Sequence, residues 1–213
     1  MPNVIRRDTL ELSLEGVQGG PVWATGRRET QRLITVTLIW PRPLVAARVA
    51  TRQFAFTKEG LDVADRDWSE RVLFKENVEG PFGVVVQVSQ SLSSQELARI
   101  TATIGGALLR AAGAEAASLV SGPGITSLAR FPFNFLAGEV SGVGKVPRIE
   151  AAGRVTLQPG QGGPIEIPLT VPEDIVRVRS VRSGGRTQSR REITHRKGTA
   201  VGTIRLDAVY YRS

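Results

Sequence analysis

Hydrophobic and polar residues alternate in short stretches along most of this chain, and glycine or proline separates one stretch from the next. The clearest stretch covers residues 33–40 (LITVTLIW), which is rich in β-branched residues and is followed by Pro41. Thr9 to Leu14 alternates as TLELSL, with the two-residue period of a strand that has one buried face. The regular spacing of the turns between such stretches is typical of a sandwich or a barrel.

The same pattern predicts further strands at 45–56, 72–74, 84–89, 125–136, 148–157, 164–171, 175–181 and 200–211. With the short stretches these make about nine or ten strands, so we expect an all-β, β-sandwich-like fold. The chain contains three tryptophans, which we expect to fill the core or its rim because the indole ring is large and mostly apolar. They are Trp23, Trp40 and Trp68.

One segment follows a helical period instead. Ser93 and Glu96 form a capping-box pair, and apolar residues then recur on one face at Leu97, Ile100 and Ile104. We therefore expect one inserted α-helix near residues 93–120, packed against the sheet. Because the segment is rich in alanine and glycine, an alternative is that it inserts into a bilayer or packs against copies of itself.

Length and composition indicate a single β-rich domain over residues 1–213, since all-β folds of this size are commonly one domain. The chain has no cysteine, which excludes disulfides, thiolate chemistry and cysteine-based metal sites. The N-terminal residues lack the apolar run of a signal peptide, so we expect a cytoplasmic protein, with a membrane-peripheral or particle-associated location as the alternative.

Charge is concentrated in one place. The formal net charge is +8, and residues 176–198 carry eight arginines or lysines against one acid, Glu192, so this segment alone contributes +7. The segment is predicted to be a strand, a turn at Ser183-Gly184-Gly185 and a second strand, which together make a basic C-terminal β-ribbon. Such a ribbon favours an anionic partner.

The predicted partner-binding residues are the cations of this ribbon: Arg177, Arg179, Arg182, Arg186, Arg190, Arg191, Arg196 and Lys197. Arginine binds phosphate and carboxylate groups in a bidentate manner. The expected partner is therefore an acidic protein surface, phospholipid headgroups or a nucleic acid backbone, and homo- or hetero-oligomeric assembly is a further expectation. The alternative is a solvated ribbon whose charges keep a sheet edge from pairing with other chains.

An acidic loop offers the one candidate metal site. Asp62, Asp65 and Asp67 lie close together in the sequence and precede Trp68, Glu70 and Phe74. This arrangement resembles the calcium-binding loop of C2-type membrane-binding β-sandwiches, although a second aspartate pair on a later loop is missing. The resemblance implies a calcium site at the three aspartates, as the alternative to a solvated acidic turn, which we expect. Arg71 and Lys75 offset the local negative charge, so calcium should bind weakly or not at all. We expect no other cofactor.

No catalytic motif stands out. His195 is the only histidine and lies among basic residues, and the chain has no G-x-S-x-G sequence to supply a nucleophile. We therefore expect a non-enzymatic binding or assembly module that contacts an anionic partner through the ribbon. One alternative is a C2-like membrane-surface module. Another is a structural subunit of a larger protein particle, in which neighbouring chains order the charged, glycine-rich segments.

Overall fold

The computed structural model describes residues 8–19, 30–40, 48–90, 149–183 and 186–212. Within them the chain is almost entirely β, with eleven antiparallel strands and one short helix, which confirms the all-β class predicted from the sequence. The helix expected near residues 93–120 and the strand expected at 125–136 lie outside the described residues. In the described part of the chain no helix is long and apolar enough to cross a membrane.

The elements in chain order are β1 (Asp8–Gln18), β2 (Thr30–Ile39), β3 (Arg48–Phe56), β4 (Gly60–Asp62), α1 (Trp68–Arg71), β5 (Val72–Val78), β6 (Phe82–Gln90), β7 (Ile149–Leu157), β8 (Gly163–Thr170), β9 (Ile175–Ser183), β10 (Arg186–His195) and β11 (Ala200–Arg212). Two of them were not anticipated from the sequence. Strand β4 is too short to show alternation, and α1 has only four residues.

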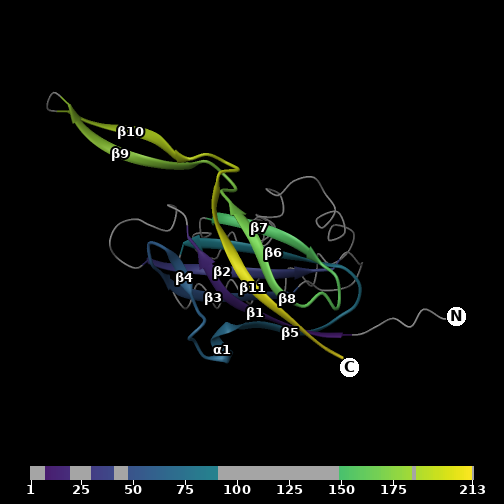
Figure 1. Cartoon of the computed structure of the whole chain (residues 1–213). Helices are drawn as coiled ribbons and strands as arrows, with labels where there is room; N and C mark the ends of the chain where they lie inside the picture. The colour runs from purple at the N-terminus through teal and green to yellow at the C-terminus, as the bar shows by residue number, and fades with distance from the viewer. Residues whose placement is uncertain (1–7, 20–29, 41–47, 91–148, 184–185, 213) are drawn as a thin grey trace, which may run out of the picture.

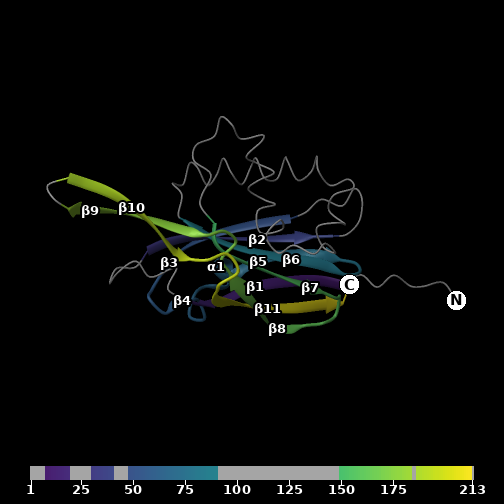
Figure 2. The same ribbon diagram turned by 90° about the horizontal axis from the view of Figure 1, so that it is seen from above.

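Nine strands form one nearly closed, barrel-like sheet in the order β3-β2-β6-β7-β8-β11-β1-β4, with β5 also paired to β1. At the junction of β7 and β8 the register contains a single pair, Ala152 with Thr170. The sheet therefore bends there into two layers, and Figure 2 shows β2 and β6 in one and β1, β11 and β8 in the other. By the order of pairing, β3 and β7 continue the first layer, and β4 and β5 continue the second. Strands β9 and β10 form a separate two-stranded sheet.

The core lies between the two layers, where the inward-facing residues of each strand meet. In β1 the leucines at 10, 12 and 14 are fully buried, and the residues between them are partly exposed. Strand β11 supplies Ile204, Leu206 and Ala208 to the same core, because the register aligns these residues with the β1 leucines and with Val17. The two-residue alternation in the sequence thus separates the residues that face the core from those on the outer surface, as expected.

Among the described residues, side-chain contacts connect β3, at one edge of the sheet, to β5, at the other. Arg52 of β3 donates a hydrogen bond from Nη2 to the carbonyl oxygen of Val72, at 3.0 Å. Arg48 of β3 forms an ion pair with Glu76 of β5, with 3.3 Å between Nε and Oε1. These contacts bring β3 next to β5 and nearly close the barrel without a backbone ladder.

A buried ion pair crosses the first layer. Arg32 of β2 donates from Nε to Oε2 of Glu150 on β7, at 2.6 Å, and both side chains are about nine-tenths buried. Strand β6 lies between these two strands, so the pair spans three strands of the sheet. Loss of one partner would leave a buried charge uncompensated, which is strongly destabilising.

A glycine permits close packing where the sheet bends. A Cβ at Gly153 of β7 would lie 2.4 Å from the carbonyl oxygen of Pro168 and 2.8 Å from Cγ2 of Ile167, both on β8. These distances are shorter than real Cβ contacts, so a side chain would push the two layers apart.

We expect Gly153→Ala to destabilise the protein by about 1–3 kcal/mol, the usual cost of overpacking a well-packed core. Urea unfolding measures this change in free energy. The matched control is Thr156→Ala, which removes an exposed side chain from the same strand and should stay within about 0.5 kcal/mol of wild type. Equal stability of the two variants would contradict the close approach of β7 and β8.

Tyr210 of β11 closes one end of the core. Its side chain packs against the core cluster, and its hydroxyl donates a hydrogen bond to the carbonyl oxygen of Gln158, at 3.2 Å. Burial raises the pKa of Tyr210 from 10.0 to about 12, and the negative charge of Asp8 adds to the increase in pKa. The folded state therefore favours the neutral phenol.

This shift predicts a pH dependence of stability. The folded pKa lies above the unfolded value, so the contribution of Tyr210 is fully present below pH 10.0 and is lost as the pH rises toward about 12. Urea unfolding should show that the free energy of unfolding of the wild type decreases between pH 10.0 and about 12. Tyr210→Phe should lack the part of this decrease that Tyr210 causes, whereas Tyr211→Phe should retain it. In Tyr211→Phe, where Tyr210 is the only tyrosine, a phenol titrating near pH 10.0 would contradict the prediction.

Candidate functional site

Strands β9 and β10 form a hairpin that projects from one end of the barrel (Figure 1). The hairpin (Ile175–His195) pairs only within itself, and no other strand or helix of the described residues forms a second layer behind it. The sequence had indicated a strand, a turn and a strand over this segment, and both strands are present. Their separation from the barrel follows only from the structure.

The root of the hairpin is held by hydrogen bonds on both strands. Val171 donates from its backbone N–H to the carbonyl oxygen of Thr199, at 2.9 Å, and accepts one from the N–H of Gly198, at 2.8 Å. The N–H of Lys197 donates to Oδ1 of Asp174, at 2.8 Å. Gly198 has a φ of 83°, a left-handed conformation that favours glycine. These contacts fix where the hairpin leaves the barrel.

The register divides the hairpin into two faces, because directly opposite residues share a face and neighbours along a strand alternate. One face, here called the arginine face, contains positions 177 and 192, which are opposite each other, and positions 179 and 190, which are also opposite. The other face, here called the valine face, contains Val176 opposite Ile193 and Val178 opposite Arg191.

The predicted partner-binding residues are distributed along the whole hairpin. Arg177, Arg190 and Arg191 have exposed side chains on the two strands, and Arg196 and Lys197 are exposed at the root. For Arg179, Arg182 and Arg186 the structure describes the backbone position only, on β9 for the first two and on β10 for the third. The structure therefore brings these residues onto one projecting element.

The three aspartates of the predicted calcium loop are not gathered into a metal site. Asp62 ends β4, and its Oδ1 accepts a hydrogen bond from the N–H of Ala64, at 3.0 Å. Asp67 immediately precedes α1 and makes no side-chain capping bond to it. Within the described residues there is no group of three or more histidine, cysteine, aspartate or glutamate side chains that could hold a metal ion.

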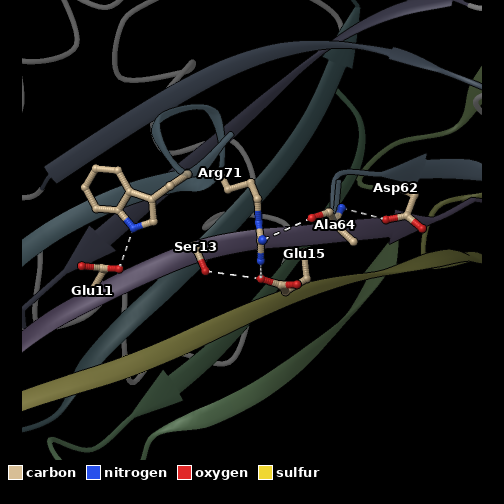
Figure 3. Close-up of polar contacts among 7 residues, drawn as sticks. Glu11, Ser13, Glu15, Asp62, Ala64 and Arg71 are labelled. Atoms are coloured by element: carbon tan, nitrogen blue, oxygen red, sulfur yellow. Dashed lines mark hydrogen bonds and ion pairs between the residues drawn. The ribbon is translucent and has the colours of Figure 1, made fainter. Parts of the chain in front are cut away.

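The loop and α1 are attached instead to the outer face of β1 (Figure 3). Trp68 donates from Nε1 to Oε1 of Glu11, at 3.0 Å. Arg71 forms an ion pair with Glu15, and its Nη1 also donates to the carbonyl oxygen of Ala64, at 3.3 Å. The indole of Trp68 is 61% exposed, so the expectation that this tryptophan belongs to the core or its rim was wrong. Trp40, by contrast, is buried as expected.

The reason for the error lies in the local sequence. Trp68 is flanked by charged and polar residues (DRDWSER), and a four-residue helix has no face long enough to pack into the core. This polar context was the available signal that the indole is exposed. The contact with Glu11, which is 57 residues away in the chain, had no local signal.

An open pocket of about 440 Å³ lies at the end of the barrel beside β4. Charged residues of both signs line it: Glu59, Asp62, Arg66 and Arg205. His195, at the end of β10, is not among the residues that line the pocket, so this lining offers no imidazole base for catalysis. The pocket is a polar recess in which the two arginines lie with two carboxylates.

No protein-family model, no characterised protein and no solved structure matches this chain. We therefore infer its function from the hairpin and from the outer surface of the barrel.

We expect calcium to bind weakly or not at all, because the three aspartates are not brought together and Arg66 and Arg71 lie beside them. Isothermal titration with calcium should show no saturable binding. A dissociation constant at or below about 10 μM that Asp67→Asn abolishes would contradict this prediction. Glu59→Gln, which removes a charge outside the aspartate group, serves as the matched control.

Proposed function

We propose that this chain is a non-enzymatic binding or assembly module whose hairpin contacts an anionic partner. The observation that carries the proposal is the projection of a highly cationic, two-stranded hairpin away from the barrel. A hairpin without a second layer is marginally stable in water by itself. Its charge and its exposure together make a bound anion the natural means of stabilising it.

The arrangement of charge on the arginine face supports an anion between the strands. The register places position 179 opposite position 190, and both are arginines. Like charges directly opposite each other destabilise an antiparallel pair. An anionic group bound between two such arginines would convert this repulsion into attraction on both sides.

The type of residue indicates the chemistry of the partner. Arginine presents a planar set of donors that matches the two oxygens of a phosphate or a carboxylate. The hairpin contains no phenylalanine, tyrosine or tryptophan, so stacking on exposed bases has no support. The partner would therefore present phosphate groups or clustered carboxylates along a line or a surface. Phosphodiester backbone, phospholipid headgroups and an acidic protein surface all meet this description.

We expect binding to duplex DNA, used as a probe of linear phosphate arrays, to weaken steeply with salt. If about half of the eight cations contact phosphates, the log–log slope should be about −3 to −4. The variant Arg177→Ser/Arg179→Ser/Arg190→Ser should reduce the magnitude of the slope by about 2 to 3, since each lost contact releases about one counterion fewer. Fluorescence anisotropy at several salt concentrations measures this slope.

A charge-matched control separates a specific contact from net charge. The variant Lys58→Ser/Arg66→Ser/Lys75→Ser removes three exposed cations from the barrel and should retain the wild-type slope. Phosphatidylserine vesicles and heparin, tested in parallel, indicate which kind of anion binds most tightly. The proposal fails if the hairpin variant and the barrel variant bind all three probes equally well.

A further inference from the structure

The valine face of the hairpin is apolar and uncovered. The exposed fractions of its side chains are 39% for Val176, 58% for Val178 and 51% for Ile193. These three residues are adjacent, since Val176 lies opposite Ile193 and Val178 is two residues further along β9. Neighbouring β-branched residues with no layer behind them make a flat apolar strip, which in water favours contact with another surface.

A second apolar surface lies on the barrel. It consists of Trp68 of α1 with Val209 and Tyr211 of β11, which are 61%, 39% and 46% exposed, and it surrounds Glu11. Glu11 lies opposite Val209 in the register and accepts the hydrogen bond of the indole, as Figure 3 shows. We call this area the Trp68 surface. The ammonium of Lys75 lies 5.6 Å from the centre of the Tyr211 ring at its border.

These two patches together account for every large hydrophobic residue that is exposed among the residues whose side chains the structure describes. Single exposed hydrophobic residues are ordinary on a protein surface, whereas here the exposed residues gather in two groups of three, as they do at interaction sites.

The charges around the two patches are opposite. The hairpin segment carries +7, with Arg191 on the valine face itself. Around the Trp68 surface the acids outnumber the cations: Glu11, Glu15, Asp65, Asp67, Glu70 and Asp207 lie there with Arg66, Arg71, Lys75 and Arg205. Opposite charge on facing patches steers association and fixes the register of the contact.

The two patches are too far apart to meet within one chain. The hairpin leaves the barrel before Ala200, whereas Val209 and Tyr211 lie nine and eleven residues further along β11. At about 3.3 Å per residue this separation is roughly 30 Å, and the hairpin points away from the barrel. Figure 1 shows the hairpin at one end of the molecule and α1 at the other.

We propose that the valine face of one copy docks on the Trp68 surface of a second copy of this chain. Such a contact is heterologous, because each copy offers its hairpin to one neighbour and its barrel to another. Repetition of the contact produces a ring or an open filament. The contact uses the face of the hairpin opposite the arginine face, so it goes beyond the anionic contact and leaves position 177 and position 190 accessible.

Two complementary variants test this contact. Val178→Thr/Ile193→Thr makes the valine face polar while keeping β-branched residues in the strands, and Trp68→Ser/Tyr211→Thr makes the Trp68 surface polar. Wild type should form species larger than its monomer mass of 23.0 kDa in light scattering, and each variant alone should be monomeric. Mixed in equal amounts, the two variants should form a dimer of twice 23.0 kDa and nothing larger, because each supplies the half that the other lacks.

Several results would overturn the proposal: a monomeric wild type at every concentration, variants that assemble like wild type, or a mixture that stays monomeric. A second measurement does not depend on the folding of these variants. The chain has no cysteine, so Ser180→Cys on the valine face and Ser13→Cys beside Glu11 should form a disulfide between copies when mixed and oxidised. Thr156→Cys, an exposed position on β7, replaces Ser13→Cys as the matched control, and equal cross-linking to both would refute the contact.

Separate variants distinguish the contact with an anion from the contact between two copies of the chain. The arginine-face variant Arg177→Ser/Arg179→Ser/Arg190→Ser should assemble like wild type even if it no longer binds anions. Val178→Thr/Ile193→Thr should retain the salt-dependent binding of DNA while it loses assembly. Loss of both properties in both variants would show that the hairpin acts as one undivided surface, which contradicts the assignment of separate faces.

Discussion

Strand β8 pairs antiparallel with β11 from Gly163 to Thr170, and the hairpin is inserted in the connection between these two strands. The same pairing therefore completes the second layer of the barrel and holds both ends of the projecting element. Val171 and Val201 are buried at this junction, and the hydrogen bonds of Val171 with Gly198 and Thr199 continue the ladder to the root. If β8 separated from β11, the core would open and the hairpin would lose its direction at the same time.

The barrel around this pairing is held in three different ways. Long ladders join most neighbouring strands, a single pair with a close approach at Gly153 joins β7 to β8, and side chains such as Arg52 connect β3 to β5. A nearly closed sheet exposes few unpaired strand edges, which limits pairing with other chains along the barrel. In the described residues the exposed large hydrophobic side chains lie instead on the hairpin and on the Trp68 surface, the two areas that we propose as contact surfaces.

Much of the fold could be predicted from the sequence. The stretches at 33–40, 148–157 and 200–211 became β2, β7 and β11 with small differences at their ends, because β-branched residues and alternation indicate strands directly. The cations of the hairpin were identified in the same way, from a run of arginines around a glycine turn. Strand β4 and helix α1 were missed, since three or four residues carry no period and are defined by their contacts with β1.

The sequence by itself determined that this chain folds into antiparallel strands with one strongly basic ribbon, because strand formation and charge density depend on neighbouring residues. Only the tertiary structure decided that the ribbon leaves the barrel, that its two faces differ, and that Trp68 meets Glu11 on the surface. These features depend on the order in which distant strands pair. That order is set by burial of the whole core, to which residues far apart in the chain contribute together.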